Sequence, residues 1–166
     1  MVHSLHTSWV LWYHSIDDTN WTKDTYTKVA EIETVEDFLG VFLKFETFTK
    51  GMFFFMRKDI FPQWEDESNI GGGYWSYKIG KNVAEKAWFN LACSCIGESL
   101  TKNSESMFNI NGISYSPKIN NVIIKILNRH SNINDHRQLT DKIDNLHPNT
   151  SQYKPHIDNK DEFVIQ

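Results

Sequence analysis

Strand-like and helix-like segments alternate along the chain, and this alternation constrains the fold most strongly. Residues 7–16 are aromatic and β-branched without a helical period, which predicts a strand. Behind Thr34, apolar residues recur at positions 35, 38, 39, 42 and 43, the spacing of an amphipathic helix with an N-terminal capping box. Further strands are expected at 52–57, 74–79, 108–116 and 122–129, with a final one at 162–165, and further helices at 82–96 and 134–146. Strands interleaved with three helices predict an α+β fold, in which one curved antiparallel sheet carries its helices on a single face and leaves the other face free to bind.

Length and charge narrow the classes of protein. With 166 residues, 40% of them hydrophobic, and no Pro/Gly/Ser-rich linker, we expect one domain over residues 1–166. The net charge of −4 argues against a protein that binds nucleic acid by covering phosphates with Lys and Arg. The longest apolar run, near residues 52–56, is too short to span a membrane, and the N-terminus lacks the layout of a signal peptide. We therefore expect a soluble protein. Cys93 and Cys95 are two residues apart in a predicted helix, where their side chains point to different faces and cannot pair, so we expect a reducing compartment, with no metal site and no cofactor.

The six tryptophans divide into two groups by their neighbours. Four have apolar neighbours at strand or helix spacing, which indicates core or half-buried packing: Trp9, Trp12, Trp75 and Trp88. Trp21 and Trp64 stand in polar loops, and Trp64 is followed directly by Glu65. An exposed indole in a polar loop favours a binding role.

Two indoles and a carboxylate suit the recognition of a guanine base. Indoles on both faces of a flat ring stack on it, with about 1–3 kcal/mol per base for one aromatic contact. A carboxylate at the ring edge accepts two charge-assisted hydrogen bonds from guanine N1 and N2. A methylated, cationic guanine adds a cation–π term of about 0.5–2 kcal/mol at each indole, so it is expected to bind better than plain guanine.

Five motifs resemble the eukaryotic translation initiation factor 4E family of messenger-RNA cap-binding proteins. They are His3-x-Leu5 with Trp9-Val-Leu-Trp12, Thr34-Val-Glu-Asp-Phe38, Ile60-Phe-Pro-Gln-Trp64-Glu-Asp-Glu67, Gly72-Gly-Tyr-Trp75 and Ile96-Gly-Glu-Ser99. The resemblance implies a curved sheet with three helices on its convex face and the cap slot on its concave face. It also implies that Trp21 and Trp64 stack on 7-methylguanine and that Glu65 binds the guanine edge. The implied partners are capped mRNA and a helical peptide of a factor 4G-like scaffold or of a repressor. We expect the protein to be a monomer apart from the scaffold and to act in the cytoplasm.

The chain departs from the family pattern around the cap phosphates. Tyr74 stands where the family usually has an arginine, and Leu127 where it has a third tryptophan. Lys118 and Asn120 align with the hairpin that usually supplies several cations, and Lys125, Arg129 or Lys154 could support Lys118. The resemblance therefore implies that fewer cations bind the cap phosphates than is usual in the family.

The chain also departs from the family pattern on the surface that is implied to bind the partner peptide. Leu39 replaces a tryptophan of the first helix, and Asn90 replaces a glutamate of the second. Leu39 could instead cover the sheet. The remaining aligned contact positions are His3, Val35, Phe89, Cys93 and Gly97.

Several alternatives stay open at this point. The departures favour, as a second interpretation, a cap-binding repressor or a binder of altered specificity. The Asn, Ile and Lys content, with the altered sites, would suit a divergent protist member of the family or a viral one, which would act in the host cytoplasm. A carbohydrate-binding module could also use paired tryptophans. An enzyme is not expected, because Glu98-Ser99 at a helix end favours a structural role over a catalytic dyad. The triple glycine at 71–73 is interpreted as a tight turn.

Overall fold

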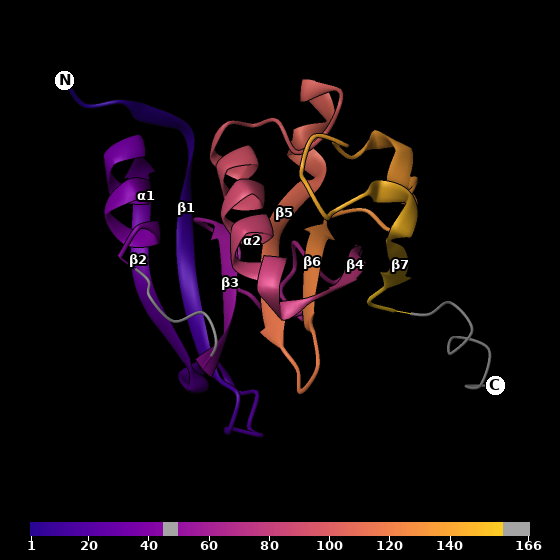
Figure 1. The fold of residues 1–166 in the computed structure, drawn as a ribbon, viewed down its shortest axis with the longest axis horizontal. Helices are drawn as coiled ribbons and strands as arrows, with labels where there is room; N and C mark the ends of the chain where they lie inside the picture. Colours follow the sequence, from indigo (N-terminus) through magenta and orange to yellow (C-terminus); the bar gives the residue numbers. More distant parts are fainter. Residues whose placement is uncertain (45–49, 158–166) are drawn as a thin grey trace.

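A computed structural model of the chain describes residues 1–44 and 50–157 (Figure 1). Its strands form a seven-stranded sheet in the order β2-β1-β3-β5-β6-β4-β7, and every neighbouring pair is antiparallel. The strands are β1 (Ser4–Ser15), β2 (Tyr26–Thr34), β3 (Gly51–Arg57), β4 (Gly73–Ile79), β5 (Ile110–Pro117), β6 (Val122–Asn128) and β7 (Gln152–Pro155). The predicted α+β architecture is confirmed. The expected strand at 162–165 lies outside the described residues.

Helices cover one face of this sheet. Helices α1 (Val35–Phe42) and α2 (Lys81–Ile96) lie side by side in front of the strands in Figure 1. The predicted capping box is present, since the Thr34 side chain accepts from the Asp37 backbone and the Asp37 carboxylate accepts from the Thr34 backbone. Short 3₁₀ turns complete the described helical segments: η1 (Lys23–Thr25), η3 (Ser104–Asn109), η4 (His136–Gln138) and η5 (Pro148–Thr150).

The prediction of a third α-helix at 134–146 is wrong. After the single turn of η4, the backbone of Leu139 pairs with Thr101 and the Thr140 amide donates to the Leu100 carbonyl, so these groups are not available to a helix. Asn145 then adopts a left-handed conformation with φ 67°, which an α-helix does not contain. The apolar pattern was nevertheless correct, because three side chains of this segment are buried in the main core: Leu139, Ile143 and Leu146.

Strand alternation separates the core from the opposite face. On β3, Phe53 and Phe55 are buried in the core between sheet and helices, whereas Met52 and Phe54 point to the other face and line a cavity there. The core also contains Trp9, Trp75 and Trp88, each 0% exposed. No helix among the described residues is both long and apolar enough to cross a bilayer.

Two strands were missed, and the glycine triple has a second role besides the predicted turn. Strands β2 and β7 are polar edge strands without a clear apolar alternation. Strand β2 pairs with β1, the preceding strand, whereas β7 pairs with β4, which is distant in sequence. The predicted turn is present, since the Gly72 amide donates to the Asn69 carbonyl oxygen at 2.8 Å. Among the described residues no glycine has a positive φ, so this turn does not need the conformational freedom of glycine. A Cβ on Gly72 would lie 1.8 Å from the Asn128 carbonyl oxygen, and one on Gly73 would lie 2.3 Å from the Lys154 carbonyl oxygen. These glycines therefore allow β4 to approach β6 and β7 closely.

Candidate functional site

A cavity of about 590 Å³ opens on the sheet face opposite the helices. The loops before β2 and after β3 supply Trp21 and Trp64, and strand residues such as Phe54 form its floor. Further lining residues are Tyr26, Met52, Pro62, Gln63, Glu65, Tyr74, Ser114, Tyr115, Ser116, Lys118, Lys125, Leu127, Lys154, Pro155 and His156. A hollow of this size accommodates a nucleotide-sized ligand.

Trp21 and Trp64 are each 49% exposed and line the same cavity. Their exposure distinguishes them from Trp9, Trp75 and Trp88, which are fully buried, and from Trp12, which packs edge-on against Phe61 at 5.0 Å between ring centroids. The division into four packing tryptophans and two exposed ones is therefore confirmed. The roles of Trp21 and Trp64 as stacking residues remain a prediction.

The loop that carries Trp64 and Glu65 is held by buried amides. Asn69, 0% exposed, donates to the carbonyl oxygens of Phe61 (3.0 Å) and Gln63 (2.7 Å). Asn111 on β5, also 0% exposed, donates to Asn69 Oδ1 at 2.9 Å and to the Ser68 carbonyl oxygen at 2.7 Å. Because these buried amides donate hydrogen bonds to carbonyl oxygens of the loop, its backbone is held in place while Trp64 and Glu65 are exposed.

A direct hydrogen bond joins the two tryptophan loops. Gln63 Nε2 donates to the backbone carbonyl oxygen of Trp21 at 2.5 Å. Since Gln63 precedes Trp64, this bond fixes the backbones on both sides of the proposed slot relative to each other. Gln63 could not be identified from the sequence, because its partner is 42 residues away in the chain.

Glu65 is exposed at the mouth of the cavity. Within residues 1–44 and 50–157 its carboxylate has no hydrogen bond or ion pair. It acts electrostatically on Tyr26: burial of the ring together with the nearby Glu65 raises the pKa of Tyr26 to about 12. Glu65 thus retains its acceptor capacity for a ligand.

The other end of the cavity is basic. Lys118, Lys125 and Lys154 come from the β5–β6 hairpin, β6 and β7, and all three line the cavity. Lys125 Nζ lies 4.0 Å from the centre of the Tyr74 ring. Burial, together with the charges of Lys118 and Lys154, lowers the pKa of Lys125. Three ammonium groups that repel one another form a favourable site for a polyanion.

Not every predicted pocket residue lies in this cavity. Tyr74 and Leu127 are cross-strand neighbours and both line it. Asn120 lies at the tip of the β5–β6 hairpin, outside the cavity lining, and Arg129 is not among the lining residues either. His156, which sequence reasoning did not select, does line the cavity; burial and the nearby Lys125 lower its pKa, while Glu65 acts in the opposite direction.

The residues predicted to bind a partner peptide gather on the helical face. Phe89 packs against Phe38 at 5.8 Å between ring centroids, which brings α2 against α1. Leu39 is 40% exposed, so it does not cover the sheet, a role taken by Phe38 and Phe42. His3 joins the start of β1 to α1, with its Nδ1 2.6 Å from Glu36 Oε1. Val35, Asn90, Cys93 and Gly97 are also at least partly exposed on these elements.

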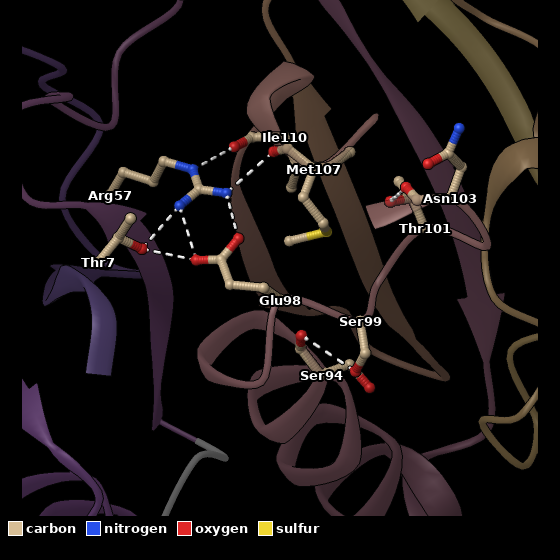
Figure 2. A network of polar contacts seen from close by, with 9 residues as sticks. All are labelled: Thr7, Arg57, Ser94, Glu98, Ser99, Thr101, Asn103, Met107 and Ile110. Atoms are coloured by element: carbon tan, nitrogen blue, oxygen red, sulfur yellow. Dashed lines mark hydrogen bonds and ion pairs between the residues drawn. The ribbon is translucent and has the colours of Figure 1, made fainter. Parts of the chain in front are cut away.

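Glu98 and Ser99 do not form a dyad. Figure 2 shows the two side chains pointing apart: Glu98 faces the guanidinium group of Arg57, whereas the Ser99 hydroxyl faces the Ser94 carbonyl. The carboxylate of Glu98 accepts from Arg57 Nη1 at 3.0 Å, from Nη2 at 2.9 Å and from the Thr7 hydroxyl at 2.6 Å. Burial acts to raise the pKa of Glu98, but the bonds from Arg57 and Thr7 outweigh it and hold the pKa below its ordinary value. The structural interpretation of Glu98 is confirmed.

No group of three or more His, Cys, Asp or Glu side chains in the described part of the chain could hold a metal ion.

Comparisons with known proteins identify the family. The family model for eukaryotic initiation factor 4E matches residues 4–163. Eukaryotic translation initiation factor 4E of Saccharomyces cerevisiae is 31% identical over 122 residues, 69% of this chain and 56% of that protein. The factor of Dictyostelium discoideum is 31% identical over 127 residues, 71% of this chain and 49% of that protein. The chain spans about half the length of these curated relatives.

Solved structures share the fold. Ascaris suum eIF4E-3 in complex with m7G cap superposes with a TM-score of 0.80 at 24% identity, covering 95% of this chain and 93% of that chain. Caenorhabditis elegans eIF4E-3 in complex with the 4E-binding protein Mextli also gives a TM-score of 0.80, at 21% identity and with coverage of 99% and 97%. Together with the match over residues 4–163, these similarities place the chain in the eukaryotic initiation factor 4E family.

Proposed function

We propose that this chain binds the 7-methylguanosine cap of mRNA and recruits the message to translation initiation through a scaffold partner. The observation that carries the proposal is the presence of Trp21, Trp64 and Glu65, all exposed, around one cavity. In this proposal the two indoles stack on the cationic base and Glu65 accepts hydrogen bonds from its N1 and N2. Family membership and the cap complex of the Ascaris protein support it.

The lysine end of the cavity is proposed to bind the cap triphosphate. Lys118, Lys125 and Lys154 replace the arginine and lysines expected from the family pattern. Phosphate binding is therefore less reduced than the hairpin sequence alone suggests, because β6 and β7 contribute two of the three cations. Tyr74 and Leu127 complete the wall between this end and the base slot.

Tryptophan fluorescence tests the binding step. Titration of the protein with m7GTP should quench Trp21 and Trp64, and GTP should bind at least about tenfold more weakly, since it lacks the cationic ring. Absence of quenching, or equal affinities for the two nucleotides, would refute cap binding.

The helical face is proposed to bind a helical peptide of the scaffold. Its apolar side chains, among them Leu39, which is exposed, and Phe89, which is partly exposed, suit an amphipathic helix that inserts apolar residues between α1 and α2. The complex of the Caenorhabditis protein with Mextli supports this assignment. We further propose that residues 1–166 act as one cap-binding domain, monomeric apart from the scaffold, located in the cytoplasm and without enzymatic turnover.

A second candidate is a cap-binding repressor that withholds messages from initiation. Leu39 favours it, because an exposed leucine offers a smaller contact than the tryptophan usual in the family. Pull-down with a factor 4G peptide separates the two: strong binding supports the initiation role, and cap binding without peptide binding supports the repressor.

A further inference from the structure

One face of Trp21 is already covered by another ring. His14 on β1 stacks on the indole with 4.1 Å between ring centroids and an angle of 6° between the planes. His14 is 0% exposed, whereas Trp21 is 49% exposed and lines the cavity, so the imidazole lies behind the indole as seen from the cavity. A base entering the slot would form the next layer of the same stack.

His14 also holds the backbone that precedes Trp21. Its Nε2 lies 2.9 Å from the Asn20 carbonyl oxygen and 3.0 Å from Thr25 Oγ1, and its Nδ1 lies 2.9 Å from the Ser15 carbonyl oxygen. The Thr25 hydroxyl donates to the Thr22 carbonyl oxygen at 2.7 Å, which closes the loop on itself. One side chain therefore ties the start of the loop to its end and supports the indole between them.

Rings and polar groups around His14 limit its movement. Tyr26 on β2 packs against the imidazole at 4.9 Å between ring centroids and 64°, and Gln63 fixes the Trp21 carbonyl from the opposite loop. Without these contacts, an exposed indole in a polar loop would lose side-chain freedom on binding, which would weaken affinity.

We propose that His14 is a positioning residue for the base slot: it fixes the Trp21 indole in its stacking orientation before the ligand arrives. This inference rests on the proposed cap-binding function and acts entirely through Trp21. Removal of His14 should therefore weaken cap binding by about 3- to 10-fold, the loss expected when the indole must be ordered during binding.

A double-mutant cycle with m7GTP tests the inference. His14→Ala should lower affinity 3- to 10-fold in the wild-type background, as estimated above, and should have almost no further effect in a Trp21→Ala background. His14→Phe keeps an aromatic ring behind the indole and should recover most of the loss. His130→Ala, at an exposed histidine outside the cavity lining, serves as the matched control and should leave affinity unchanged.

The outcomes separate this inference from the proposed function. Wild-type protein that fails to bind m7GTP refutes cap binding itself. Wild-type binding with unchanged affinity in His14→Ala, or an equal loss in both backgrounds, overturns the role of His14. Thermal unfolding of each variant ensures that affinities are compared below the unfolding transition. If His14→Ala does not fold, His14→Leu provides the test: it fills the space without an aromatic ring, so it should lose affinity relative to His14→Phe, and equal affinities would overturn the role of His14.

Discussion

Two charged clusters in this molecule are satisfied in opposite ways. Around Arg57, each guanidinium nitrogen donates to protein oxygen: Nε to the Ile110 carbonyl, Nη1 to Thr7 and Glu98, and Nη2 to Glu98 and the Met107 carbonyl (Figure 2). Around the cavity, Glu65, Lys118 and Lys154 have no ion-pair partner within residues 1–44 and 50–157. The first cluster uses its charges inside the protein, and the second leaves them available to a ligand.

This difference allows substitutions that affect stability to be distinguished from those that affect ligand binding. Arg57 and Glu98 have side chains only 15% and 19% exposed, so removal of either leaves a poorly solvated charge. Glu65 and Lys154 are exposed, so water solvates their charges when no ligand is bound. Substitutions in the Arg57–Glu98 cluster should therefore change stability alone, and substitutions in the cavity should change affinity alone.

The largest expected effect is on stability. Glu98→Ala leaves the Arg57 guanidinium without its carboxylate and should lower the free energy of unfolding by about 3 kcal/mol in urea denaturation. Affinity for m7GTP, measured well below the unfolding transition, should stay within about twofold. Glu85→Ala, at an exposed site on α2, is the control and should change stability by less than about 0.5 kcal/mol. A large loss of affinity in Glu98→Ala would break the comparison.

The next effect is on affinity. Glu65→Gln replaces a charged acceptor with an amide whose N–H groups face the donors of guanine, so m7GTP should bind about 10- to 100-fold more weakly in fluorescence titration. Glu67→Gln in the same loop should have little effect, and neither variant should shift the unfolding temperature. Equal losses for Glu65 and Glu67 would show that only general negative charge matters.

The lysine end should contribute less per residue. Lys118→Ala and Lys154→Ala should each weaken m7GTP binding a few-fold and reduce the slope of log affinity against log salt by roughly one unit. Binding of the 7-methylguanosine nucleoside should not change, since it carries no phosphate. Lys86→Ala on α2 controls for net charge. Salt slopes identical to wild type would remove these lysines from the site.

The smallest effect concerns acid stability. The pKa of Glu98 is lower in the folded protein than its ordinary value of 4.5, so its ionised form stabilises the fold at neutral pH. That contribution is complete above about 4.5 and is lost as the pH falls through the lower folded value. Wild-type stability should therefore decrease more steeply below this pH than that of Glu98→Ala. Parallel curves for the two proteins would argue against the ionised pair.

The part of the cavity proposed to bind the guanine base was predictable because residues near one another in the sequence indicate it. Trp64 and Glu65 are adjacent, and Trp21 stands in a polar stretch, so residue type and neighbours alone distinguished them from the core tryptophans. The lysine end was predictable only in part: Lys118 was named, but Lys154 was one of three possible supports that could not be placed. Lys154 reaches the cavity only through the pairing of β7 with β4, where it stands opposite Tyr74. Strand β7 has four residues and no apolar alternation, so nothing near it in sequence indicates its partner.

Gln63 was missed for the same reason, because its partner is 42 residues away. His14 was missed although Trp21 is near it in sequence. His14 was one of several scattered histidines, and its importance comes from the return of the chain at Trp21 to stack on it. The prediction of a helix at 134–146 was wrong for a different reason. Its apolar spacing correctly indicated buried side chains, but backbone pairing with Leu100 and Thr101 prevented an α-helix. Local pattern thus predicted which side chains are buried better than it predicted the backbone that buries them.

A crystal structure with m7GpppA bound would show how the cavity holds the cap. We expect the methylated base between Trp21 and Trp64, with Glu65 oxygens within hydrogen-bond distance of N1 and N2 and the phosphates beside Lys118, Lys125 and Lys154. A base bound outside the two indoles, or one whose Watson–Crick edge points away from Glu65, would contradict this expectation.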